Sequence, residues 1–152
     1  MTSQDFQRLH KLASLWVSEQ EKTILDQGIP LSADEQIDAY HIGVKEIQKV
    51  RLLKVKQIPL PEHPELKAAV EEAGLIGEKT IGIAFRWGIY VREDYWGQRN
   101  LVVHELTHTS QYERYGGIEA FLKDYLQECL LEGYPNGPLE QEAKQMEAKI
   151  CR

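Results

Sequence analysis

Residues 101–110 read Leu101-Val102-Val103-His104-Glu105-Leu106-Thr107-His108-Thr109-Ser110. If this stretch is helical, His104 and His108 lie one turn apart on the same face. Two imidazoles in that relation can both bind one tetrahedral Zn²⁺ at about 2.0–2.1 Å. Glu105, beside the first histidine, can take a proton from a zinc-bound water and pass it to a leaving amine. The stretch therefore predicts a helix that carries two zinc ligands and a general base.

The surroundings of Glu105 favour a buried site. It is the only permanently charged residue between Leu101 and Ser110, and burying a carboxylate is costly unless a cation or hydrogen bonds compensate. The alternative interpretation is a fortuitous motif, in which two histidines on an ordinary helix are merely hydrogen-bonded.

A catalytic zinc site normally has three protein ligands and one position for water. The metzincin pattern would place Gly and His where this chain has Gln111 and Arg114, so that arrangement is excluded. The other histidines lie upstream without ligand spacing and are expected at the surface or at helix caps: His10, His41 and His63. The third ligand is therefore expected to be a carboxylate from a later helix. Pro138 opens such a helix, with Glu140 in its first turn.

His104-Glu105-Leu106-Thr107-His108 followed by a helix with glutamates resembles the thermolysin-like zinc peptidases, or gluzincins. It is more similar still to short bacterial proteins with a minimal gluzincin core. In these families the third ligand is a Glu, often within Glu-x-x-Ala-Asp. Glu140-Gln141-Glu142-Ala143 matches Glu-x-x-Ala, so the resemblance implies Glu140 as the ligand and Glu142 as the alternative. Lys144 stands where the pattern often has Asp, so another group, Glu142 or a backbone carbonyl, would have to orient a ligand.

The resemblance also implies a function, that of a zinc metallopeptidase acting on a peptide or protein. An edge strand above the metal would pair with the substrate, and residues 81–85 or 89–91 are candidates for it. A tyrosine hydroxyl could stabilise the developing oxyanion, and four are available: Tyr112, Tyr115, Tyr125 and Tyr134. The alternative function is that of an inactive metal-binding or interaction protein that keeps a zincin fold.

Outward from the motif, hydrophobic spacing and caps predict helices over 98–114, 118–131 and 138–150. Upstream, the same signals predict helices over 4–27, 32–49 and 64–73, the second of them opened by a Ser32/Glu35 capping box. Strands are expected over 50–58, 80–85 and 89–92, with the last two joined as a hairpin. This order predicts an α+β fold, mostly helical and zincin-like, with a small antiparallel sheet.

Length and charge limit the remaining possibilities. The 152 residues fit a single domain, in which 1–79 supply N-terminal helices and a strand and 80–150 form the metal-site core. A net charge of -6 argues against a nucleic-acid partner. Because no apolar run is long enough for a membrane span or a signal peptide, we expect no membrane association. Two cysteines without CxxC spacing, Cys129 and Cys151, suit a cytoplasmic protein with reduced thiols.

Overall fold

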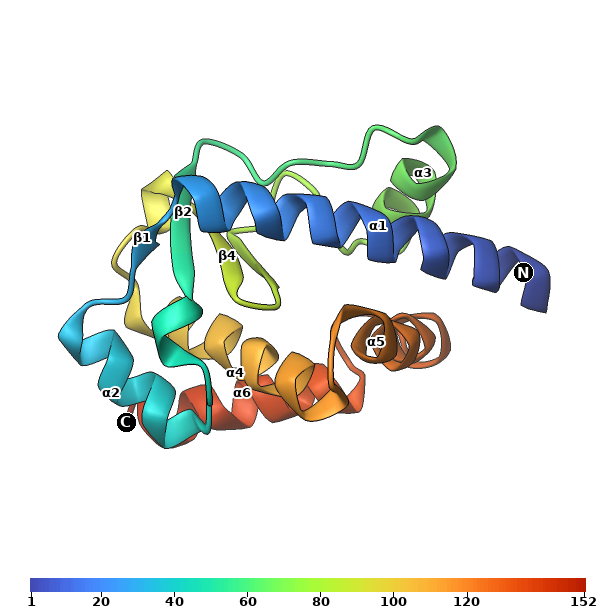
Figure 1. Ribbon diagram of the computed structural model, residues 1–152. Helices are drawn as coiled ribbons and strands as arrows, with labels where there is room; N and C mark the ends of the chain where they lie inside the picture. Colours follow the sequence, from blue (N-terminus) through green and yellow to red (C-terminus); the bar gives the residue numbers. More distant parts are fainter.

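The computed structural model describes all residues from Met1 to Arg152. It has an α+β fold of six α-helices and one four-stranded sheet (Figure 1). The helices are α1 (Ser3–Gln27), α2 (Ala33–Ile42), α3 (Pro64–Glu72), α4 (Arg99–Tyr115), α5 (Ile118–Glu132) and α6 (Pro138–Ile150). The strands are β1 (Ile29–Pro30), β2 (Arg51–Val55), β3 (Gly82–Phe85) and β4 (Gly88–Arg92). None of the helices is both long and apolar enough to cross a membrane.

The sheet is mixed, which corrects the expectation of a purely antiparallel one. Its strand order is β1-β2-β4-β3, in which β2 and β4 are parallel and both outer pairs are antiparallel. The expected hairpin forms β3 and β4. A parallel pair needs a crossover of a dozen or more residues, and the long connection through α3 and β3 provides it. Alternating side chains define the faces of a strand but not its direction, so the sequence pattern could not specify this pairing.

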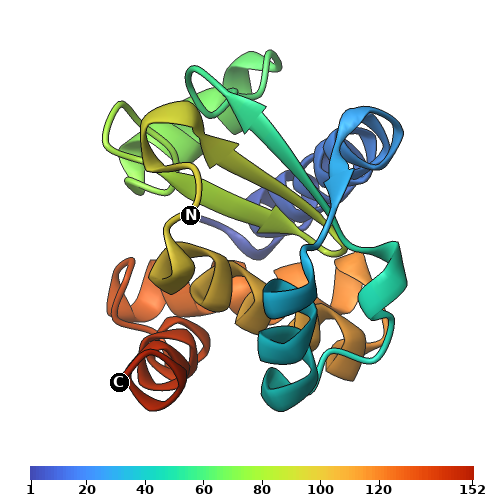
Figure 2. The same ribbon diagram turned by 90° about the vertical axis from the view of Figure 1, so that its left-hand side faces the viewer.

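Helices cover the sheet on both faces. On β4, Tyr90 joins an apolar cluster with residues of α1 and α5. Its neighbours Ile89 and Val91 join a second cluster with residues of α2 and α4. Successive side chains of a strand point to opposite faces, so α1 lies on one side of the sheet and α4 on the other (Figure 1). Figure 2, turned by 90°, shows the sheet above α4 and the C-terminal helix α6, in red, below it.

The end of one helix and one short strand differ from the sequence prediction. Helix α2 ends at Ile42 rather than near Lys49, because Gly43 adopts a left-handed conformation at φ 105° and caps it. A short 3-10 helix, Ile47–Lys49, then leads into β2. Strand β1 was not predicted, since its two residues follow Gly28 directly and read only as a helix stop. The remaining helices and strands begin and end within a few residues of the expected positions.

Candidate metal centre

Helix α4 carries the motif residues and is the most buried helix of the protein. Nearly every residue from Leu101 to Tyr112 is buried, because α4 packs against the sheet, α2 and α6 at once. Gly116, in the left-handed region at φ 85°, ends the helix and donates hydrogen bonds to its last carbonyls. Glu105 and His108 are each 6% exposed. The motif therefore lies inside the protein, as the uncharged sequence around it predicted.

Helix α6 runs beside α4 and brings Glu140 to the histidines (Figure 1). Pro138 occupies its first turn, where the missing N–H costs nothing. No side chain of its own caps the helix. Instead, Glu128 of α5 accepts a hydrogen bond from the Leu139 N–H at 2.9 Å. The start of α6, and with it Glu140, is thus tied to α5.

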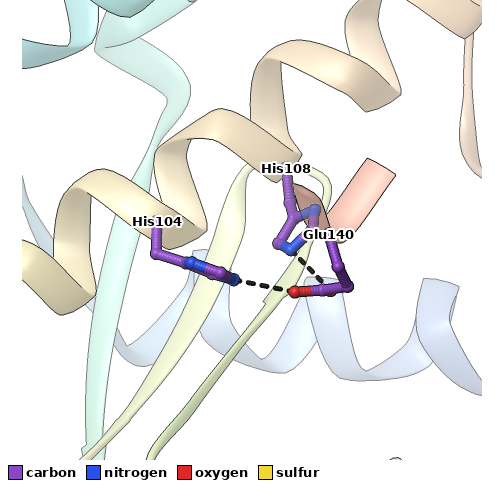
Figure 3. Close-up of side chains that lie close together, drawn as sticks. All are labelled: His104, His108 and Glu140. Atoms are coloured by element: carbon purple, nitrogen blue, oxygen red, sulfur yellow. Dashed lines mark hydrogen bonds and ion pairs between the residues drawn. The ribbon is translucent and has the colours of Figure 1, made fainter. Parts of the chain in front are cut away.

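His104, His108 and Glu140 form one compact cluster, drawn in Figure 3. Glu140 lies between the two rings: its Oε1 is 2.9 Å from His104 Nε2, and its Oε2 is 2.9 Å from His108 Nε2. One ligand atom from each of the three residues lies within 4.8 Å of the others. The structure therefore brings together the three residues that the sequence and the resemblance selected as ligands.

The other nitrogen of each ring is also held. His104 Nδ1 is 2.6 Å from Glu147 Oε2, and His108 Nδ1 is 2.8 Å from Gln111 Oε1. A partner at Nδ1 fixes the orientation of the ring and leaves Nε2 to coordinate a metal, as is usual for metal-binding histidines. Glu147 was not identified from the sequence. It lies seven residues after Glu140, two helical turns on the same face, and this spacing was the available signal.

Glu142, the alternative ligand, points away from the cluster. Its carboxylate accepts hydrogen bonds from Arg114 at 2.8 and 2.9 Å and from Gln111 Nε2 at 2.8 Å. Gln111 Nε2 also donates to the Leu139 carbonyl, so the amide oxygen of Gln111 must face His108. Glu142 therefore helps to orient His108 through Gln111, and the geometry favours Glu140 as the third ligand.

When no metal is bound, the two histidines of the cluster hold their protons more tightly than a free imidazole does. Burial lowers the pKa of His104, but hydrogen bonds to Glu140 and Glu147 and the nearby Glu105 charge outweigh it and raise that pKa to about 9. The pKa of His108 is raised by the same balance. Burial by itself would raise the pKa of Glu140. Its hydrogen bonds to both histidines outweigh this and hold the pKa far below the ordinary value. The geometry therefore favours a carboxylate between two cationic rings, a charge pattern that a bound cation could replace.

Glu105 differs from the other charged residues of the cluster because its carboxylate has no hydrogen-bond partner, yet no fully buried side-chain nitrogen or oxygen of the protein lacks one. Its oxygens therefore reach open space, which two hollows provide. Glu105 lines both an apolar cavity and a polar cleft that meet at the cluster. Burial raises its pKa, although the charged histidines oppose this. A carboxylate with these properties suits proton transfer.

Of the four tyrosines considered, only Tyr134 has a free hydroxyl beside the cluster. Tyr125 donates to Glu140 Oε2 at 2.7 Å, so it positions the carboxylate. Tyr112 donates to the Ala84 carbonyl and Tyr115 to Asp124, both away from the cluster. Tyr134, on the loop between α5 and α6, lines both hollows together with Glu105 and has no hydrogen bond.

The upstream histidines lie outside the cluster. His63 caps α3, His41 sits in the last turn of α2, and His10 contacts the Glu119 carbonyl at 2.7 Å. Comparison of this chain with known protein families, with curated proteins and with solved structures finds no match.

Proposed function

We propose that this protein is a zinc-dependent hydrolase in which His104, His108 and Glu140 hold the metal. More specifically, it is a metallopeptidase with a zincin-like site, and Glu105 is its general base. The observation that carries the proposal is the convergence of both Nε2 atoms on Glu140, each at 2.9 Å, beside a buried carboxylate with no partner.

The donor set fits zinc. Two imidazole nitrogens and one carboxylate are the ligands of a large group of catalytic zinc sites, which leave a fourth position for water. Both Nε2 atoms already face the Glu140 carboxylate at 2.9 Å, and one donor atom from each of the three residues lies within 4.8 Å of the others, so an ion would take the place of these direct contacts. Zinc held there would act as a Lewis acid that activates a water molecule near neutral pH.

The protein's own residues would then handle the proton and the substrate. Glu105 accepts the proton of the attacking water and returns it to the leaving amine. Tyr134 can donate its hydroxyl hydrogen to the carbonyl oxygen as negative charge develops there. Strand β3 is an edge of the sheet, and Gly82 of that strand lines both hollows. Its free edge can pair with an extended peptide backbone, so peptides are the preferred substrate class.

Replacing Glu105 by Gln separates this chemistry from metal binding. We expect the Glu105→Gln protein to keep its zinc and lose at least about 100-fold in kcat, because proton transfer contributes that much or more. The measurement is cleavage of a mixed library of internally quenched peptides, with zinc content determined on the same samples. Glu132→Gln, at the exposed end of α5, is the matched control and should leave both values unchanged.

Unchanged turnover in Glu105→Gln would exclude Glu105 as the base. A full equivalent of zinc in the unsubstituted protein, without cleavage of any peptide, would instead favour a metal-binding protein that keeps the fold but has no activity.

A further inference from the structure

The turn between β3 and β4 holds one residue in a strained conformation. The register pairs Phe85 with Gly88, so Arg86 and Trp87 form a two-residue turn. Arg86 has a φ of 59°, in the left-handed region that glycine usually supplies in such turns. A larger residue keeps this conformation only where its surroundings hold it there. The contacts of Arg86 therefore show what fixes the turn.

Two helices on opposite sides of the sheet hold this turn. From α1, the buried Glu21 carboxylate accepts two hydrogen bonds from the Arg86 guanidinium, at 2.7 and 2.8 Å, and one from the Trp87 N–H at 3.0 Å. From α4, the Thr109 hydroxyl donates to the Arg86 carbonyl at 2.6 Å. Thr109 is fully buried and directly follows the proposed zinc ligand His108. The end of β3 is thus fixed to the helix that carries the metal cluster.

The edge of β3 that faces away from β4 is partly closed. Because the Arg92 N–H bonds to the Ile81 carbonyl, odd-numbered residues from Ile81 onward turn their backbone groups toward β4. The backbone groups of Gly82 and Ala84 therefore point to the free edge. There Tyr112 of α4 donates to the Ala84 carbonyl at 3.3 Å. Three groups remain without a partner: the N–H and carbonyl of Gly82 and the N–H of Ala84.

These three free groups lie beside the metal cluster. Gly82 lines both hollows together with His104 and Glu105. Ala84 is only 6% exposed, and a buried N–H without an acceptor is rare in proteins. Two donors and one acceptor along an edge match one extended peptide residue and the carbonyl two residues away from it. The free groups therefore fit a peptide backbone.

We propose that Thr109 is a positioning residue for the substrate, an inference that rests on the proposed peptidase function. Its hydroxyl acts through the Arg86 carbonyl and fixes the free edge of β3 relative to the metal cluster. Glu21 holds the same turn from the other side of the sheet. Together the two contacts keep the free groups of Gly82 and Ala84 in place, so that the peptide backbone binds in a single register.

The contact of Thr109 with the turn is separate from metal binding. The only other acceptor of its hydroxyl is the Glu105 carbonyl at 3.4 Å, and a hydroxyl has a single hydrogen to donate. Neither bond goes to a side chain of the cluster. Removing the hydroxyl should therefore alter peptide binding and leave the metal in place.

Thr109→Val removes the hydroxyl and keeps the shape of the side chain. For the library peptide that is cleaved fastest, we expect KM to rise about 3- to 10-fold, the effect of one lost hydrogen bond. We expect kcat and zinc content to stay unchanged, because substrate and transition state lose the same binding. Thr109→Ser keeps the hydroxyl and should restore KM. Thr23→Val, whose hydroxyl bonds only within α1, is the matched control.

Methylation of the substrate backbone distinguishes positioning from a general loss of stability. Analogues of the same peptide, N-methylated at one amide each, identify the N–H that bonds to the Gly82 carbonyl by its higher KM. In Thr109→Val the same methyl group should raise KM less, because the two changes affect one interaction. An equal rise in both proteins, or a Thr109→Val protein that loses kcat or zinc along with peptide binding, would overturn the inference while the proposed function stands.

NMR of the isotope-labelled, zinc-free protein tests the edge without any activity. On titration with acetyl-tetra-alanine amide, the amide signals of Gly82 and Ala84 should shift, and Thr109→Val should need about 3-fold more peptide or above. Arg86→Gly suits the φ of 59° and releases only the contact with Glu21, so it should act in the same direction and serves if Thr109→Val does not fold. Shifts without cleavage of any peptide would support the inferred edge and contradict the proposed function. Unshifted amide signals would overturn the inference, whether or not peptides are cleaved.

Discussion

At the scale of single residues, the two histidines are notable because all four of their ring nitrogens have a partner. Glu140 faces both Nε2 atoms, while Glu147 and Gln111 hold the Nδ1 atoms. The rings are therefore oriented before any ion binds, and a preorganised site loses less free energy on ordering its ligands. A purely structural ion-pair cluster would not require both Nε2 atoms to converge on one carboxylate.

Replacing Glu147 by Gln should weaken zinc binding without removing a ligand. The amide can still accept the Nδ1–H of His104, but it lacks the negative charge that makes the ring a better donor to the metal. We expect the affinity for zinc to fall about 10- to 100-fold, as for other residues that orient metal ligands. Competition with a chelating dye measures this change. Lys144→Gln, at an exposed position of the same helix, is the control. Equal affinities in the two variants would show that Glu147 has no orienting role.

At the scale of helices and strands, the start of α6 decides where Glu140 stands. Since α6 has no side-chain cap of its own, the hydrogen bond from Leu139 N–H to Glu128 takes that place. Glu128→Ala should therefore fray the first turn of α6, lower the free energy of unfolding by about 1 kcal/mol and weaken zinc binding. Glu128→Gln keeps an acceptor and should lie close to the unsubstituted protein. Urea unfolding and the dye competition measure the two effects. A Glu128→Ala protein with unchanged zinc affinity would show that α5 does not position Glu140.

The helices were predictable from the sequence because each carries its own signals of spacing, cap and stop. Ser32 with Glu35, for example, marks the start of α2, and the structure contains that capping box. The strand arrangement was not predictable in the same way. Whether β2 pairs with β4 in parallel depends on where the connection through α3 runs, and no residue within either strand encodes that.

The candidate site was predictable only where its residues share one helix. His104, Glu105 and His108 share one helix, so their relative placement follows from helical geometry. Glu140 was selected by resemblance, and its choice over Glu142 depends on how α6 packs on α4, which no local pattern reveals. Glu147 and Gln111 were missed because their roles exist only once those two helices are side by side.

At the scale of the whole molecule, apolar clusters on both faces of the sheet form the core, and none of the three proposed ligands belongs to either cluster. We therefore expect the zinc-free protein to remain folded, with zinc adding stability in proportion to its binding.

Zinc binding should cancel the part of the pH dependence of stability that His104 contributes. The pKa of His104 is about 9 in the zinc-free folded protein and 6.5 in its ordinary state, so its contribution to stability is complete below pH 6.5 and is lost as pH rises through 9. Zinc needs neutral imidazoles, so its own contribution grows over the same window. The Tm measured at pH 6.5 and 9, in chelator and in zinc, tests this. We expect the zinc-induced increase in Tm to be larger at pH 9, and an increase that shrinks would contradict the assigned protonation states. His104→Gln should show a smaller pH dependence, because only His108, whose pKa is also raised, then contributes.

The central prediction is that His104, His108 and Glu140 together bind one equivalent of zinc. The decisive measurement is the zinc content, by elemental analysis, of the unsubstituted protein and of the Glu140→Gln and Glu142→Gln variants after equilibration with zinc and removal of the excess. The predicted result is one equivalent in the unsubstituted protein and in Glu142→Gln, and almost none in Glu140→Gln. A full equivalent in Glu140→Gln, or no zinc in the unsubstituted protein, would contradict it.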